Sequence, residues 1–300
     1  MISLTITTGT IMKQVSIAVM GGSGLYQMDQ LKNPQEHWLD TPFGKTSDAI
    51  ITGQISGIDV AFLARHDRGH RLIPSEVPYL ANIYALKTLG VRYLISISAV
   101  GSLKEEVKPL DMLLPDQFID LTKRRINTFF GQGAVAHVAM AQPICAVLAN
   151  ILAESVIETA IKDSTLHTQG TYVCIEGPAF STKAESEWYR SMGASVIGMT
   201  NMPEAKLARE ASIAYATLAL VTDYDGWHPR EASVNAEMAI ANLMKNAVNA
   251  QQVVINAIVK LGNLLPDSIA HHALDSALVT SPEQMSVEVK ARLGALLKQS

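Results

Sequence analysis

The sequence predicts an α/β protein built in layers, from its composition and from the order of its apolar segments. Short apolar runs that end in small polar residues alternate with longer segments of helical period, as in layered α/β folds. Of the 300 residues, 48% are hydrophobic and 17% are charged. This balance predicts a large buried core and excludes a disordered chain.

The predicted strands are apolar, often β-branched runs that end at turn residues. They cover residues 15–20, 48–55, 58–64, 92–98, 171–175, 195–198 and 213–222. Ser56-Gly57 separates two of these runs and predicts a β-hairpin. Gly21-Gly22-Ser23-Gly24 follows the first run, so that strand should enter a tight turn.

The predicted helices are longer segments bounded by capping residues or by glycine. They cover residues 74–89, 143–162 and 233–262, and others begin at residues 182, 201 and 281. Thr182 and Glu185 form a capping-box pair. Asn201 supplies a cap and Glu204 a first-turn acid for the helix that follows them. Ser233 is the expected cap of the long helix.

The chain is expected to form one domain, because it contains no internal repeat and no low-complexity linker. Residues 1–12 are interpreted as a flexible leader, residues 13–263 as the main domain, and residues 264–300 as a helical extension. An extension of this length is too small to have a core of its own.

Composition excludes several classes of function. The net charge of −4 predicts no basic surface for nucleic acid or an anionic membrane, and Lys123-Arg124-Arg125 is interpreted as a solvated loop. The most apolar stretch, residues 213–221, is shorter than the roughly 20 residues that span a bilayer. Two cysteines without paired spacing exclude a disulfide framework and fit a reducing cytoplasm. The low charge also predicts apolar surface buried in an oligomer.

Small polar residues gather in the loops that follow several predicted strands. These loops are residues 21–24, 98–102, 176–182 and 199–201. In open α/β sheets ligands bind at the carboxyl ends of strands, whereas one such loop alone is ordinary turn chemistry. Their repetition favours a ligand-binding crevice.

Common nucleotide-binding and nucleophile motifs are absent from these loops. Gln27 stands where a dinucleotide fingerprint requires its third glycine, and no Gly-Lys-Ser/Thr forms a P-loop. Leu25 stands where a nucleophile elbow around Ser23 requires glycine. Ser23 and the neighbouring glycine amides still suit an anion, because consecutive N–H groups form a nest.

Arg65 and His66 follow the predicted hairpin and also suit an anion. Arginine offers a planar fork of donors, and histidine adds one more. His66 and His70 are four residues apart, but Gly69 and the lack of an intervening glutamate disfavour a zinc-binding helix. We therefore expect no metal site.

Asp223 and Asp225 close the most apolar strand, where alternation places both carboxylates on one face. One interpretation is a helix-capping or loop pair. In the other, like charges in a half-buried cleft raise the pKa of one carboxyl, which can then donate a hydrogen bond.

Taken in order, these segments resemble the trimeric purine nucleoside phosphorylase family over residues 15–261. The matching segments are residues 21–25, 63–66, 81–87, 98–103, 116–120, 137–143, 176–181, 198–204 and 222–225. The resemblance implies a single-domain mixed sheet flanked by helices and a homotrimer. It also implies a reaction without metal or organic cofactor, in which the co-substrate phosphate converts a purine nucleoside to free base and ribose 1-phosphate.

The resemblance assigns phosphate binding to residues on several of these loops, namely Ser23, Arg65, His66, Ser98, Ala99 and Thr200. Ala99 would act through its backbone N–H. Met199 would lie along the ribose and Phe180 against the base. Because phosphate arrives charged, this chemistry needs positioning and charge stabilisation rather than a side-chain nucleophile.

Asp223 is the residue expected to select the base. Adenine presents N7 as an acceptor and its 6-amino group as a donor, and a protonated carboxyl complements both. By resemblance, members acting on 6-oxopurines carry asparagine here and glutamate where this chain has Ser181. Asp223 and Ser181 therefore indicate a 6-aminopurine, with Asp225 supporting Asp223 or contacting the amino group.

The end of the site that holds the 5′ substituent is less typical of the family. His137 lies in a segment that, by resemblance, reaches a neighbouring subunit's pocket near this substituent. Ala236 and Ala239 stand where the family more often has valine, which leaves a roomier pocket.

The expected reaction is phosphorolysis of S-methyl-5′-thioadenosine to adenine and 5-methylthioribose 1-phosphate, a pentosyl transfer. One alternative is a preference for 6-oxopurine nucleosides or methylthioinosine. Two others are a nucleosidase that uses water and a nucleotide-binding protein without activity.

Overall fold

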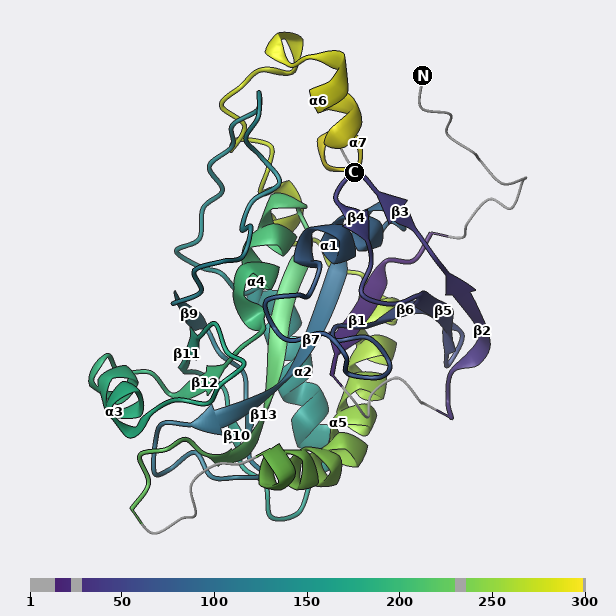
Figure 1. Ribbon diagram of the computed structural model, residues 1–300. Helices are drawn as coiled ribbons and strands as arrows, with labels where there is room; N and C mark the ends of the chain where they lie inside the picture. Colours follow the sequence, from purple (N-terminus) through teal and green to yellow (C-terminus); the bar gives the residue numbers. More distant parts are fainter. Residues whose placement is uncertain (1–13, 23–28, 230–235, 299–300) are drawn as a thin grey trace.

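The computed structural model describes residues 14–22, 29–229 and 236–298, and the statements below concern these residues. A large mixed β-sheet carries helices on both faces (Figure 1), which confirms the predicted α/β class. The strands are β1 Ile17–Gly21, β2 Lys32–His37, β3 Asp40–Thr41, β4 Gly44–Lys45, β5 Ile50–Ile55, β6 Ile58–Ala64, β7 Tyr93–Ser102, β8 Met112–Leu113, β9 Gln117–Asp120, β10 Leu166–His167, β11 Thr171–Cys174, β12 Val196–Gly198 and β13 Ala214–Tyr224. The α-helices are α1 Tyr79–Thr88, α2 Ala146–Thr159, α3 Lys183–Ser191, α4 Asn201–Glu210, α5 Ala236–Leu264, α6 Val287–Arg292 and α7 Gly294–Leu297.

The centre of the sheet is parallel. β1 lies between β6 and β7, and β7 pairs on its other side with β13. β5 and β2 continue the sheet antiparallel at one edge, while β12 pairs antiparallel with the end of β7 and carries β11 and β9. The carboxyl ends of β1, β6, β7 and β13 therefore meet at one edge of the sheet.

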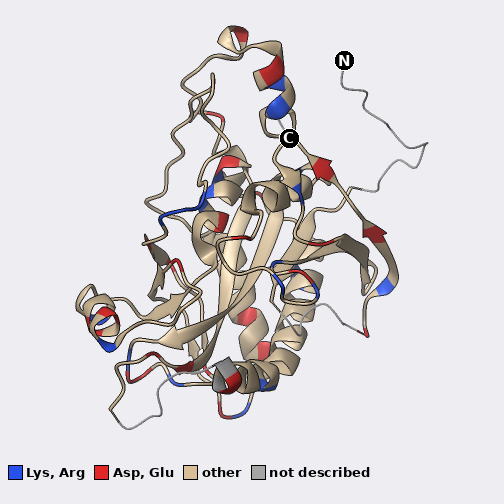
Figure 2. Ribbon diagram, in the orientation of Figure 1, with Lys and Arg blue, Asp and Glu red and all other residues tan. Residues whose placement is uncertain are grey.

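Helices cover the two faces of this sheet in pairs. α1 and α4 pack on one face, with Ile83 and Leu207 in a shared core. α2 and α5 pack on the other, where Leu148 and Val254 are fully buried. Figure 2 shows basic and acidic residues interspersed over the ribbon. In the described part of the chain no helix is long and apolar enough to cross a membrane.

Several local predictions are confirmed. β5 and β6 form an antiparallel hairpin around Ser56 and Gly57, both of which have positive φ. Thr182 and Glu185 form the predicted capping box at the start of α3. The expected cap Ser233 lies outside the described residues, and α5 continues past residue 262 to Leu264.

Other boundaries were predicted wrongly. The helix expected from residue 74 begins only at Tyr79, because Pro78 restricts the residue before it to extended backbone. β7 and β13 run on to Ser102 and Tyr224 because their last residues pair with each other. The short strands β2, β3, β4, β8, β9 and β10 carry no strong apolar pattern and were missed.

The tail after α5 packs against the main domain rather than standing apart. Leu293 and Leu296 lie in the same core as α1. Ser281 does not cap an α-helix: it precedes a 3₁₀ turn, Pro282–Gln284, and makes no side-chain capping bond. Ser286 caps α6 instead, by accepting a hydrogen bond from the Val289 N–H.

Candidate active site

A cavity of about 490 Å³ lies at the carboxyl ends of the central strands, a size typical of small-molecule sites. Most of the predicted site residues line it: Arg65, His66, Ser98, Ala99, Phe180, Ser181, Met199, Thr200, Asp223, Asp225 and Ala239. Ser23 and the side chain of Ala236 lie outside what the structure describes. His137 is exposed and is not among the residues lining this cavity.

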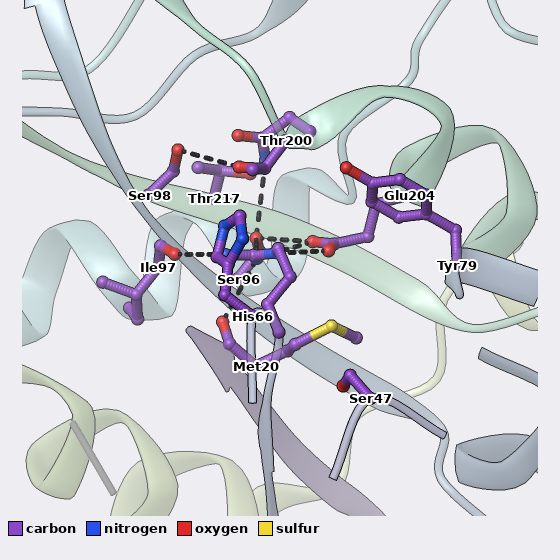
Figure 3. Close-up of polar contacts among 12 residues, drawn as sticks. Met20, Ser47, His66, Tyr79, Ser96, Ile97, Ser98, Thr200, Glu204 and Thr217 are labelled. Carbon is purple, nitrogen blue, oxygen red and sulfur yellow. Dashed lines mark hydrogen bonds and ion pairs between the residues drawn. The ribbon is translucent and has the colours of Figure 1, made fainter. Parts of the chain in front are cut away.

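Three hydroxyl groups cluster at one end of the cavity. Ser98 is on β7, and its Oγ lies 3.4 Å from Thr200 Oγ1 (Figure 3) and 3.1 Å from the Tyr172 hydroxyl. Burial raises the pKa of Tyr172, and the hydrogen bond with Ser98 opposes this rise. At Gly198 a Cβ atom would lie 1.9 Å from the Tyr172 hydroxyl oxygen. Glycine is therefore required there to admit the tyrosine.

Arg65 also lines the cavity, and it forms a fully buried ion pair with Glu204. Its Nε and Nη2 donate to the two carboxylate oxygens of Glu204 at 2.6 and 2.9 Å, and its Nη1 donates to the Ile97 carbonyl. Burial opposes the charge, but Glu204 keeps the pKa of Arg65 above its ordinary value. The guanidinium is thus fixed and cationic. Within the described residues only one Nη1 hydrogen is left for a ligand.

Glu204 occupies the first turn of α4, as predicted, but its role differs from the expected one. Its carboxylate is buried and accepts hydrogen bonds from Ser96 (Figure 3) and Tyr215 as well as Arg65. Asn201 is not the helix cap: it is buried and donates to Thr217 and Tyr215. The polar start of α4 therefore faces inward and holds Arg65 in place.

His66 contributes a neutral ring to the cavity. Burial lowers its pKa to about 4, against a raising effect from the hydrogen bond to the Leu72 carbonyl. Nδ1 lies 2.8 Å from that carbonyl, which can only accept, so Nδ1 carries the proton. The neutral ring therefore offers Nε2 as an acceptor, which suits the hydroxyl of a protonated phosphate.

Asp223 lies at the other end of the cavity, and its carboxyl has a raised pKa. Burial raises its pKa to about 6; the Thr222 hydroxyl, which donates to Oδ2 at 2.6 Å, lowers it, and nearby Asp225 raises it. Its Oδ1 lies 3.0 Å from the position of a Cβ on Gly101. A carboxyl packed this closely is readily protonated when a ligand excludes water.

A β-bulge presents this carboxyl. β13 gains one residue against β7 between Val221 and Asp223, and such bulges re-aim side chains next to active sites. Asn242 donates to the Thr222 carbonyl at 2.7 Å and Asn246 to the Val221 carbonyl at 3.3 Å. The bulge is therefore held by α5, whose side chains also line the cavity.

Asp225, Ser181 and Phe180 complete this end. Asp225 is buried and accepts a hydrogen bond from the Ser186 hydroxyl, so its orientation is fixed by α3. Ser181 Oγ is buried and has no hydrogen-bond partner among the described residues. Phe180 is 44% exposed at the cavity. An unpaired hydroxyl and an open aromatic ring suit a flat polar ligand.

Sequence reasoning missed several residues of the site. Tyr172 looks like an ordinary strand aromatic, and no local signal links it to Ser98. Leu243 and Met244 lie on the apolar face of α5 and could be distinguished from core residues only by the fold. In the part of the chain that the structure describes, no three His, Cys, Asp or Glu residues gather as metal ligands.

Comparison with known protein families shows that this fold and cavity belong to a phosphorylase. The sequence profile described as "Phosphorylase superfamily" matches residues 16–260. The match covers all the central strands and most of α5.

Individual relatives narrow this class. A protein of Synechocystis sp. named S-methyl-5′-thioadenosine phosphorylase is 57% identical over 99% of this chain and 91% of its own. A crystal structure of a methylthioadenosine phosphorylase from an Antarctic soil metagenomic library is 62% identical, covering 95% of this chain and 100% of the other with a TM-score of 0.92. A mutant adenosine/methylthioadenosine phosphorylase of Schistosoma mansoni, solved with methylthioadenosine, is 34% identical, covering 83% and 92% with a TM-score of 0.79. The chain belongs to the S-methyl-5′-thioadenosine phosphorylase family.

Replacing Glu204 by glutamine should destabilise the protein by about 3–5 kcal/mol, because it leaves the buried Arg65 cation without its counter-charge. The measurement is the free energy of unfolding in urea. Glu36→Gln is the matched control, since Glu36 pairs with Arg68 at the surface and should change stability by about 0–1 kcal/mol. Equal losses in the two variants would contradict the role given to Glu204.

Replacing Asp223 by asparagine should stabilise the protein more at pH 7 than at pH 4. The folded pKa of Asp223, about 6, exceeds the ordinary value of 3.8, so the folded state holds the proton more tightly. Wild-type stability is therefore lost as the pH rises through this window, by about 3 kcal/mol in all, and an asparagine does not titrate.

Unfolding curves of both proteins at the two pH values measure this effect. Asp29→Asn, which removes an exposed carboxylate, controls for the change in net charge. A stability difference that is the same at both pH values would show that Asp223 titrates as an ordinary aspartate.

Proposed function

We propose that this chain cleaves S-methyl-5′-thioadenosine with inorganic phosphate to adenine and 5-methylthioribose 1-phosphate. The observation that carries the proposal is one cavity with an anion-binding end and a protonatable carboxyl. Ser98, Thr200 and Arg65 lie at the first end, and Asp223 lies at the second. The names of the relatives support the same reaction.

At the anion end the chain would hold phosphate on one face of the ribose. Ser98 and Thr200 would donate hydroxyl hydrogens, Ala99 its backbone N–H and Arg65 its remaining Nη1 hydrogen. His66 would accept a hydrogen bond from the phosphate hydroxyl, and Ser23, the residue after Gly22 of the cavity wall, would complete the set. These groups order the nucleophile and supply a fixed positive charge, so the step needs neither a metal ion nor an organic cofactor.

At the base end a phosphate oxygen forms a bond to C1′ as the C1′–N9 bond breaks and its electron pair enters the purine. Asp223 would give its proton to N7, so that adenine leaves as a neutral base. Its other oxygen would accept from the 6-amino group, with Asp225 and Ser181 close by and Phe180 against the ring. A pKa raised to about 6 makes Asp223 easier to protonate near neutral pH than an ordinary aspartate.

The 5′ substituent would lie against α5. Ala239, Ile240, Leu243 and Met244 give that wall of the cavity an apolar surface, which suits a methylthio group better than a hydroxyl. Met199 would lie along the ribose between the two ends.

The test is an assay of base release with and without phosphate, using methylthioadenosine, adenosine, inosine and methylthioinosine. We expect release to require phosphate and kcat/KM to be highest for methylthioadenosine. Release without phosphate would identify a hydrolase, and no release at all would identify a binding protein.

The same assay with Asp223→Asn tests base selection. Asparagine can still hydrogen-bond to adenine, but it cannot give a proton to N7, and its NH2 group can donate to both N7 and O6 of a 6-oxopurine, where one hydrogen bond is worth roughly 1–3 kcal/mol. The ratio of kcat/KM for methylthioadenosine over methylthioinosine should therefore fall by about 5- to 150-fold. An unchanged ratio would remove Asp223 from the base-selecting role.

We further propose a homotrimer in which His137 reaches the 5′ end of a neighbouring site. Two observations support this proposal. The His137 side chain is exposed, and the His137 backbone N–H donates a hydrogen bond to the carbonyl of Ala277, in the segment after α5, at 2.8 Å. Light scattering should give three times the chain mass at assay concentration. A fully active monomer would contradict the shared site.

A further inference from the structure

Arg125 differs sharply from the two basic residues before it. Lys123 and Arg124 are exposed, as expected for a solvated loop, but the Arg125 side chain is only 1% exposed. The prediction of a solvated basic run is therefore wrong for Arg125. Burying a guanidinium costs free energy unless its N–H groups have hydrogen-bond acceptors. The acceptors of Arg125 therefore show which segments it holds in place.

The guanidinium joins three segments that surround the cavity. Nη1 donates to the carbonyls of Met199 and Met202, each at 2.6 Å. Nη2 donates to the Glu176 carbonyl at 2.7 Å, and Nε to the Glu176 carboxylate at 3.3 Å. The Arg125 guanidinium also lies 5.5 Å from the centre of the Tyr79 ring. A planar fork reaches all these acceptors at once, which a single ammonium group cannot do.

The Glu176 carboxylate also holds the loop that carries Arg125. Its Oε2 accepts the backbone N–H groups of Lys123 at 2.6 Å and Arg124 at 3.1 Å, and Ser75 donates to Oε1. Although burial opposes it, these donors and Arg125 hold the pKa of Glu176 at about 2. The carboxylate remains ionised at neutral pH and stays opposite Arg125.

The contact with Met199 leads directly to the anion end. A peptide carbonyl and the N–H that follows it point to opposite sides of a trans peptide plane. With the Met199 carbonyl held by Arg125, the Thr200 N–H is turned away from the guanidinium. The Thr200 hydroxyl is within hydrogen-bond distance of the Ser98 hydroxyl, which also contacts the Tyr172 hydroxyl.

We infer that Arg125 is a positioning residue that orients the Met199–Thr200 peptide, and through it the hydroxyls of Thr200 and Ser98 that receive phosphate. It acts from behind the loop and needs no contact with substrate. This inference rests on the proposed phosphate site. It adds a residue that fixes the site's geometry.

The experiment compares Arg125→Lys and Arg125→Ala with Arg124→Ala, the exposed neighbour, in steady-state assays that vary phosphate and methylthioadenosine separately. Misplacing binding groups by about 1 Å costs roughly 100-fold, so kcat/KM for phosphate should fall 10- to 100-fold in both Arg125 variants. Arg124→Ala should match the wild type. Guanidinium ion at millimolar concentration should restore part of the phosphate response to Arg125→Ala but not to Arg125→Lys.

A purely structural role would lower the urea midpoint of the Arg125 variants and leave kcat/KM per folded molecule unchanged, which would overturn the inference. If neither Arg125 variant folds, Tyr172→Phe is the alternative test, because Tyr172 contacts the Ser98 hydroxyl. An unaltered dependence of its activity on phosphate would also overturn the inference. If the wild-type protein releases base without phosphate, the proposed function itself is wrong. If the wild-type protein requires phosphate and the Arg125 variants behave like it, only the inference about Arg125 is wrong.

Discussion

The parallel pairing of β7 with β13 is the constraint on which the site depends. It brings Ser98 and Ala99, on β7, to the same edge of the sheet as Asp223, on β13. Each end of the cavity thus has at least one residue on one of two neighbouring strands. A single extra residue in β13 before Asp223 then turns its carboxyl toward the cavity, and Gly101 on β7 leaves room for it.

The second requirement is a fixed cation at the strand ends. Arg65 follows β6, Ser96 is on β7, Glu204 is on α4 and Tyr215 is on β13, and hydrogen bonds join all four. The ion pair therefore links the helix layer to three central strands. Because Glu204 and its partners hold the guanidinium, little reorganisation is needed when an anion arrives. The same saturation limits Arg65 to a minor share of the direct hydrogen bonds to a ligand.

Local signals in the sequence predicted what depends on local physics. The hairpin at Ser56-Gly57 and the capping box at Thr182 need only a few adjacent residues, and both are present. The likeness of several loops to one family also predicted most of the residues that line the cavity. Arg125 and Asn201 could not be interpreted in this way, because their partners are about 15 to 80 residues away in the chain. A basic run and a helix-start asparagine look the same whether they face water or the core, and only the packed fold decides.

Burial disfavours the charged form at both ends of the cavity, but the partners of the two groups differ, and this difference makes a phosphorolytic step possible in one small space. Arg65 and Asp223 are both buried, with exposed fractions of 1% and 5%. Arg65 keeps its charge because it donates two hydrogen bonds to the Glu204 carboxylate. Asp223 has one hydroxyl donor and another carboxylate nearby, so burial raises its pKa to about 6. A fixed positive charge thus remains where a dianion would bind, and a carboxyl that takes up a proton more readily than an ordinary aspartate lies where a leaving base would gain electrons. The counter-ion, not the depth of burial, decides which chemistry each end can perform.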